Sequence, residues 1–153
     1  MTLYHCAPIP LEAGSVIKPG NWGRLINTYE HQQFGNNSGI AFRELAFEHV
    51  RVQEFPQKPS RLTSCFALDG LEPATTYWSN SSPLGILYEV DLVDKNSKIH
   101  EGKLSLLDGL NGNEAYFRAW QQRGMRYWSG AGDGDSELVI EGSLRVVSFV
   151  ASR

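Results

Sequence analysis

The sequence lacks a surplus of basic residues, a set of cysteines and any long apolar run. Its 14 lysines and arginines are outnumbered by 17 aspartates and glutamates, giving a net charge of −3. Non-specific phosphate binding, as in a general DNA or RNA coat protein, is therefore not expected. No segment has the roughly 18 to 20 apolar residues of a membrane span, and the N-terminus does not resemble a signal peptide. Cys6 and Cys65 are too few for a disulfide framework. We expect a cytoplasmic protein with reduced, buried thiols and no membrane partner.

What is present is typical of one globular domain spanning residues 1–153, because 41% of the residues are hydrophobic and no repeat or linker is visible. Strands are predicted over Thr2–Cys6, Arg61–Leu68, Ile86–Val93, Met125–Trp128, Glu137–Ile140 and Leu144–Val150. Helices are predicted from the N-cap Ser38 to before Pro56, after Asp69 to Trp78, and from Asn113 to a stop at Gly124. In the last helix, Tyr116, Phe117 and Trp120 form an apolar stripe expected in the core. Since strands and helices do not alternate regularly, the pattern predicts an α+β fold.

Most common chemical motifs are not met. The glycine-rich residues 130–134 lack a Walker lysine and do not open a helix, so they are interpreted as a turn. Acidic residues alternate from Asp133 to Glu137 as in a calcium loop, but Leu138 and Leu144 stand where that loop needs glycine and glutamate. The histidines and cysteines show no zinc-binding spacing. No metal site is predicted.

Three short motifs occur in an informative order. They are Tyr4-His5-Cys6-Ala7 on the first strand, Phe66-Ala67 followed by a helix with Ala74-Thr75-Thr76-Tyr77, and Glu137-Leu138-Val139-Ile140 at a late strand. In order and spacing they resemble the His-Tyr-Glu branch of the ADP-ribosyltransferase superfamily, which includes diphtheria-type toxins, poly(ADP-ribose) polymerases and rifampicin-modifying transferases. The resemblance covers almost the whole chain. It implies an ADP-ribosyltransferase-like split β-sheet core with short helices, and NAD as substrate.

The resemblance also implies a role for each motif residue. Glu137 would be catalytic, bonding the 2′-hydroxyl of the nicotinamide ribose and favouring the positive charge that develops as the glycosidic bond breaks. His5 would hold a ribose hydroxyl of the adenosine half. Tyr77 would stack on the nicotinamide ring, with Trp78 as the alternative. Phe66 would complete the NAD site.

Two features depart from that branch. Cys6 replaces a glycine that lets the backbone approach nicotinamide, so its side chain would narrow this contact. Thr63-Ser64 resembles part of the Ser-Thr-Ser motif of the Arg-Ser-Glu branch, and both residues are included in the predicted NAD site. That branch has arginine on its first strand, however, where this chain has His5. The His-Tyr-Glu assignment is therefore preferred.

Acceptor binding is predicted for three residues. Asp135 lies two residues before Glu137, where the Arg-Ser-Glu branch carries the residue that selects the acceptor. Tyr127 and Trp128 belong to an aromatic and basic run that could contact an acceptor, and a half-buried strand edge fits the same run equally well.

The sequence thus predicts a mono-ADP-ribosyltransferase that transfers ADP-ribose from NAD to an unidentified acceptor, as a bacterial or phage toxin or effector. An antitoxin or immunity protein is a possible partner. One alternative is an NAD glycohydrolase, in which water replaces the acceptor. The other is a non-catalytic, transferase-like module that binds a protein. Taken singly, His5, Tyr77 and Glu137 also fit structural roles, and their shared order favours catalysis.

Overall fold

The structure, a computed structural model, describes residues 1–30, 36–82 and 84–153. Its centre is a 7-stranded sheet with the order β2-β7-β4-β1-β3-β6-β5. The strands are β1 (Leu3–Ala7), β2 (Val16–Ile17), β3 (Cys65–Asp69), β4 (Ile86–Leu92), β5 (Lys98–Lys103), β6 (Ser136–Glu141) and β7 (Leu144–Ala151). Every neighbouring pair in this order is antiparallel. The sheet and its helices confirm the α+β prediction.

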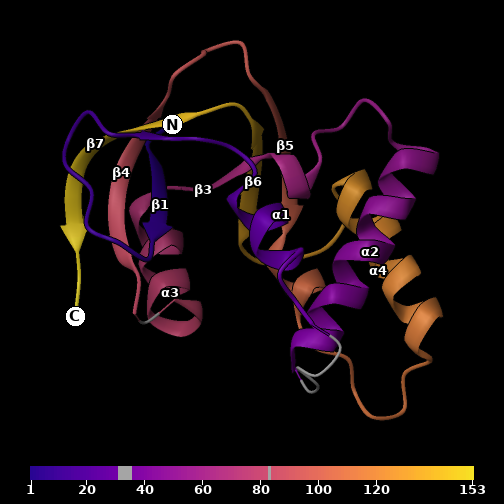
Figure 1. Cartoon of the computed structure of the whole chain (residues 1–153). Helices are drawn as coiled ribbons and strands as arrows, with labels where there is room; N and C mark the ends of the chain where they lie inside the picture. Colours follow the sequence, from indigo (N-terminus) through magenta and orange to yellow (C-terminus); the bar gives the residue numbers. More distant parts are fainter. Residues whose placement is uncertain (31–35, 83) are drawn as a thin grey trace.

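The helices divide between the two halves of the sheet. They are α1 (Asn21–Ile26), α2 (Asn36–Glu54), α3 (Leu71–Ser81) and α4 (Tyr116–Ser129), with two 3-10 segments, η1 (Arg61–Thr63) and η2 (Leu104–Leu107). Figure 1 shows α3 beneath β4 and β1, whereas α2 and α4 lie together on the side of β5 and β6. Within the described ranges, no helix is both long and apolar enough to cross a membrane.

The sheet opens between β1 and β3. These strands pair at only two positions, Leu3 with Asp69 and Tyr4 with Leu68. Beyond them, β1 continues along β4, while β3 continues along β6. The two halves of the sheet therefore diverge from His5 onward, and an opening forms in the middle of the fold.

Alternation along β6 decides which side of the sheet each of its residues meets. Leu138 and Ile140 join an apolar cluster with residues of β1, β4 and β7, whereas Val139 packs with residues of α2 and α4. Because side chains alternate between the faces of a strand, Glu137 shares the face of Val139. The catalytic candidate is thus placed on the helical side.

Sequence predictions about element boundaries are wrong in several places. The segment from Arg61 is not yet strand, because 61–63 form a 3-10 turn whose Leu62 amide donates to the side chain of Ser60. Residues 125–128 are not a strand but the last part of α4, which ends at Gly130 with a left-handed φ of 79°. Helix α2 begins at Asn36, before the predicted N-cap Ser38.

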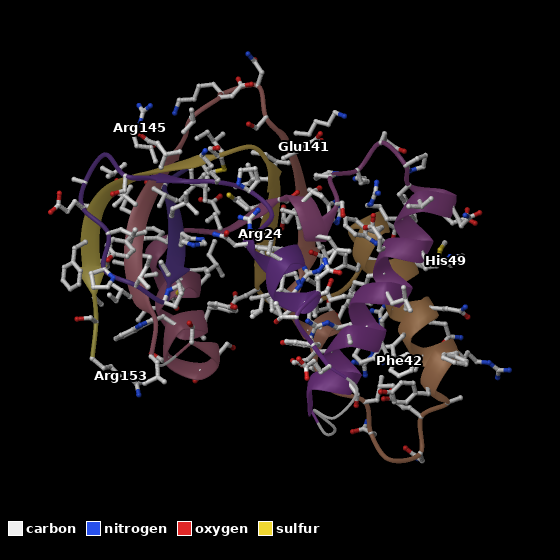
Figure 2. All side chains as sticks on the ribbon, in the orientation of Figure 1. Arg24, Phe42, His49, Glu141, Arg145 and Arg153 are labelled. Carbon is white, nitrogen blue, oxygen red and sulfur yellow. The ribbon has the colours of Figure 1, made fainter. Side chains whose placement is uncertain are left out.

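The predicted aromatic stripe of α4 is only partly core. Trp120 is buried, but Tyr116 and Phe117 are 43% and 70% exposed. Both rings contact Phe42 of α2, at centroid distances of 5.2 and 6.1 Å, and Figure 2 shows Phe42 where the two helices lie together. These aromatics therefore form a surface cluster between the helices.

Candidate active site

One cavity collects residues from all three motifs. It has a volume of about 330 Å³ and lies where β1 and β3 diverge. The predicted residues that line it are His5 and Cys6 of β1, Phe66 of β3, Tyr77 of α3 and Glu137 of β6. The divergence of the strands therefore brings segments far apart in the sequence to a single site.

The cavity also includes a residue from α1. Trp22 lines it, and the indole Nε1 is buried without a hydrogen-bond partner among the described residues. Helix α1 approaches η1 closely because Gly23 has no side chain, and a Cβ at this position would overlap the carbonyl of Leu62. Figure 2 labels Arg24 on the same helix, near the middle of the molecule. Neither α1 nor Trp22 was predicted from the sequence.

His5 is held in one tautomer. Its Nδ1 lies 2.7 Å from the carbonyl oxygen of Phe66, and a carbonyl only accepts, so Nδ1 carries the proton. Burial lowers the pKa of His5, and the bond to Phe66 offsets only part of this effect. The ring is neutral at pH 7, and Nε2 is left as a hydrogen-bond acceptor. Nε2 can therefore accept a hydrogen bond from a hydroxyl group of a ligand.

The structure distinguishes Tyr77 from its neighbour Trp78. Tyr77 lines the cavity, and burial raises the pKa of its hydroxyl, which stays protonated at neutral pH. Trp78 is used elsewhere: its Nε1 donates to the carbonyl of Gly85 at 2.7 Å, and Arg153 lies over its ring. Of the two rings, Tyr77 is the one placed to meet a ligand.

Cys6 lines the cavity as a neutral thiol. Its side chain is half-buried, and burial raises the pKa of Cys6 to about 11. At neutral pH it is therefore not a thiolate nucleophile. The predicted narrowing of the nicotinamide contact by Cys6 stays a prediction.

Glu137 is held through one of its two oxygens. The residue is 7% exposed. Oε1 accepts a hydrogen bond from the guanidinium of Arg61 and another from the Tyr127 hydroxyl at 2.6 Å. Oε2 accepts none from the part of the chain that the structure describes. One oxygen is thus fixed by the protein, while the other is available to a ligand in the cavity.

Arg61 belongs to a buried network of alternating charges. Its Nε lies 3.0 Å from Oε2 of Glu44, and Oε1 of Glu44 lies 3.0 Å from the guanidinium of Arg43. Burial alone would raise the pKa of Glu44, but the charges and hydrogen bonds of Arg61 and Arg43 together lower it. Two cations and two anions, Glu137 included, therefore balance, as buried ions require.

The prediction that Tyr127 and Trp128 contact an acceptor is corrected by their burial. Both are fully buried on α4. Trp128 Nε1 donates to the carbonyl of Phe47 at 2.8 Å, and the Tyr127 hydroxyl is bonded to Glu137. Neither ring offers a surface to another molecule. Tyr127 instead contacts Glu137 from the protein interior, through the hydrogen bond of its hydroxyl to Oε1.

Like Tyr127 and Trp128, three further predicted residues lie outside the cavity. Thr63 is exposed at the end of η1, and Ser64 is buried next to it, where its carbonyl accepts from the amide of Gly20. Asp135 is exposed in the turn before β6, and its carbonyl accepts from the amide of Leu104. Their NAD-binding and acceptor-binding roles stay predictions.

A second cavity, of about 550 Å³, adjoins the first. The two share Arg43 and Leu107, and the second is otherwise lined mainly by apolar and aromatic residues, among them Ile40, Tyr116 and Trp120. Arg43 thus stands between two hollows, one lined by the motif residues and the other by α2 and α4.

Comparison with known families places the chain without assigning it a reaction. A search of the curated proteins found no match. A family model described as "Protein of unknown function (DUF2441)" matches residues 18–152, a range that includes Tyr77, Glu137 and the charged network but not β1. The match covers most of the chain, which therefore belongs to the DUF2441 family.

Proposed function

We propose that the protein is a mono-ADP-ribosyltransferase that cleaves NAD and transfers ADP-ribose to an acceptor. One observation carries the proposal: His5, Tyr77 and Glu137, picked out by three separate motifs, line the same cavity. Residues that bind one ligand must lie at one site, and these three do so although they are far apart in the sequence. The divergence of β1 from β3 supports the further proposal that the sheet has an ADP-ribosyltransferase-like split core.

The proposed reaction breaks the bond between ribose C1′ and the nicotinamide nitrogen. The bonding electron pair leaves with nicotinamide, and positive charge develops on the ribose as an oxocarbenium-like transition state forms. The nucleophilic atom of the acceptor then bonds to C1′ and loses its proton. In this proposal, Oε2 of Glu137 accepts from the 2′-hydroxyl, and its negative charge stabilises the transition state electrostatically.

The neutral residues of the cavity would place the substrate. The ring of Tyr77 would stack on nicotinamide, and Nε2 of His5 would accept from a ribose hydroxyl. A volume of about 330 Å³ is near the lower end for small-molecule sites. We therefore assign the cavity to part of the dinucleotide, with the rest extending beyond it.

Transfer requires space for an acceptor beside the donor. The second cavity provides it, because it shares Arg43 and Leu107 with the first. This arrangement favours a transferase over an NAD glycohydrolase, which needs only water. The acceptor would enter from the side of α2 and α4.

The test is incubation with NAD labelled in its adenylate half, with and without cell lysate. We expect release of nicotinamide and transfer of label to a lysate component, and Glu137→Gln as the control should release little. Sensitivity of the labelled product to protease or nuclease identifies the acceptor class. Free ADP-ribose alone would instead indicate a glycohydrolase. Absence of NAD binding in calorimetry would overturn the proposal and favour a non-catalytic module.

A further inference from the structure

We propose that Arg61 and Tyr127 are positioning residues for Glu137, and that they fix Oε1 so that Oε2 is presented to the substrate. This inference rests on the proposed function, since presentation matters only if Glu137 acts on a bound molecule. It assigns roles to two buried residues: Arg61, which was not among the predicted site residues, and Tyr127, which was predicted to contact an acceptor. Neither residue needs to touch the substrate.

The three groups form a closed set of hydrogen bonds. An Arg61 Nη1–H donates to the Tyr127 hydroxyl at 2.7 Å, and another donates to Oε1 of Glu137. The Tyr127 hydroxyl donates its single proton to the same oxygen at 2.6 Å. Because Arg61 has no acceptor, the proton directions are determined and both donors are aimed at a carboxylate. Such charge-assisted bonds are the strong ones in proteins.

Arg61 is itself fixed from the other side. Its Nε and Nη2 donate to the carboxylate of Glu44 in three contacts of 3.0 to 3.2 Å. Arg43 in turn donates to Glu44 at 3.0 Å and to the carbonyl of Leu107 at 2.8 Å. The guanidinium of Arg61 therefore cannot turn away from Glu137 without breaking its bonds to Glu44.

Tyr127 is fixed by the strand beside Glu137. In the register of β5 and β6, Gly102 stands opposite Glu137. A Cβ at position 102 would overlap the ring of Tyr127, so the missing side chain is what admits this ring. The backbone carbonyl of Tyr127 also accepts from Nε2 of His100 at 2.9 Å. Gly102 and His100 thus hold Tyr127 of α4 over β5, where its hydroxyl reaches Glu137.

Several other ionisable groups surround Glu137. Arg61 of η1 and Tyr127 of α4 contact it directly, and Arg43 and Glu44 of α2 lie beyond Arg61. The others are His5, Cys6 and Tyr77 around the cavity, and Glu101 and Lys103 on the neighbouring strand β5. Lys103 Nζ donates to Ser136 at 2.8 Å and lies 3.5 Å from Glu101, so it has partners of its own. Among the described residues, the cation in contact with Glu137 is Arg61.

The first test is Tyr127→Phe, which keeps the buried ring and removes only the hydroxyl. We expect kcat to fall about 10- to 100-fold, the range for losing a hydrogen bond to a charged group, with little change in KM for NAD. The acid limb of the kcat–pH profile should move to higher pH, because a carboxylate that loses a donor is protonated more easily.

A matched control is Tyr88→Phe, which also removes a buried, hydrogen-bonded hydroxyl: the Leu11 amide donates to it at 2.7 Å, away from Glu137. This variant should leave the acid limb where it is. Gly102→Ala provides a second disruption of Tyr127, and circular dichroism shows whether it folds. If folded, it should move the acid limb in the same direction as Tyr127→Phe.

A measurement without turnover separates this inference from the proposed function. Carbon-13 NMR of the labelled glutamate carboxyls, with Glu137 assigned through Glu137→Gln, follows its titration directly. We expect Tyr127→Phe to raise the pH at which Glu137 titrates. If the wild-type protein does not cleave NAD but this shift occurs, the proposed function fails and the positioning of Glu137 stands. An unchanged titration and an unchanged acid limb in Tyr127→Phe would overturn the positioning role.

Discussion

The two walls of the cavity differ in charge. The neutral wall consists of His5, Cys6 and Tyr77, from β1 and α3, and none of these side chains is charged at pH 7. The charged wall consists of Arg61 and Glu137 with the Tyr127 hydroxyl, linked by buried hydrogen bonds. The neutral wall suits binding of an aromatic ring and a hydroxyl, whereas the charged wall suits stabilisation of developing charge.

The difference matters because removing a charge from water costs desolvation free energy. Well-packed apolar residues in place of a buried ion network are often neutral or stabilising, so the network is weak evidence for stability. A structural explanation of the charged wall is therefore incomplete. Holding one carboxylate oxygen in a fixed orientation next to a cavity gives the network a use that an apolar core would not serve.

The largest expected effect comes from breaking the charged wall at its centre. Arg61→Met leaves Glu44 and Glu137 buried without their shared cation and should lower the free energy of unfolding by about 3 to 5 kcal/mol. Urea denaturation measures this. The control Lys98→Met removes an exposed cation 3.7 Å from Glu141 and should cost about 1 kcal/mol at most. A loss for Arg61→Met as small as that of the control would contradict the network.

The next effect separates catalysis from folding. Glu137→Gln keeps the shape of the side chain and leaves Arg61 paired with Glu44, so the variant should lose less stability than Arg61→Met and should fold and bind NAD. Turnover should fall on the order of 10² to 10³, because the lost charge stabilises the transition state more than the ground state. The control is Glu141→Gln, at the exposed end of β6. Near-normal turnover for Glu137→Gln with an inactive Glu141→Gln would show that Glu141, and not Glu137, is the catalytic carboxylate.

The neutral wall was accessible from sequence because its residues lie in short motifs whose order can be compared. His5 and Tyr77 were predicted because their motifs occur in the order of a known family, whereas the choice of Tyr77 over Trp78 needed the structure, in which Trp78 bonds to Gly85. The interpretation of Phe66 as part of the site needed only its place on the strand. Each motif is a few adjacent residues long, and the order of the motifs along the chain can be read from the sequence.

In the charged wall, Glu137 was predicted from its motif, but its contacts with Arg61 and Tyr127 were not. Arg61 meets Glu44 and Glu137 across 17 and 76 residues, and no local pattern links such positions. The strand predicted over residues 125–128 followed from treating Gly124 as a helix stop. Instead, Gly124 brings α4 close to α2, where its Cβ would lie 3.3 Å from Val50. The helix therefore continues, and Tyr127 becomes buried next to Glu137 rather than exposed to an acceptor.

A smaller effect sharpens the account of the neutral wall. Tyr77→Ala should weaken binding of both NAD and free nicotinamide by about 1 to 3 kcal/mol, since each presents the ring on which Tyr77 is proposed to stack. Tyr77→Phe keeps the ring and should bind nearly as the wild type does. Calorimetric titration makes the comparison. If Trp78→Ala weakens binding and Tyr77→Ala does not, the stacking role belongs to Trp78.

The smallest effect concerns the single hydrogen bond proposed for His5. His5→Ala should weaken NAD and ADP-ribose by about 0.5 to 1.5 kcal/mol, the usual contribution of a neutral hydrogen bond. It should leave free nicotinamide unaffected, because nicotinamide has no ribose. Equal weakening of all three ligands in calorimetry would show that His5 supports the cavity in general rather than a ribose hydroxyl.

The same bond has a pH dependence whose sign follows from the tautomer. Burial lowers the pKa of His5 below its usual value, so the ring is neutral at neutral pH and should be protonated only at a more acidic pH than an exposed histidine. On further acidification Nε2 gains a proton and can no longer accept from a hydroxyl, so affinity should fall. In His5→Ala this acid-dependent fall should be absent. The opposite result, an affinity that rises on acidification in the wild type but not in His5→Ala, would contradict this role. It would mean that Nε2 of a protonated His5 donates to the ligand, while Nδ1 keeps its bond to Phe66.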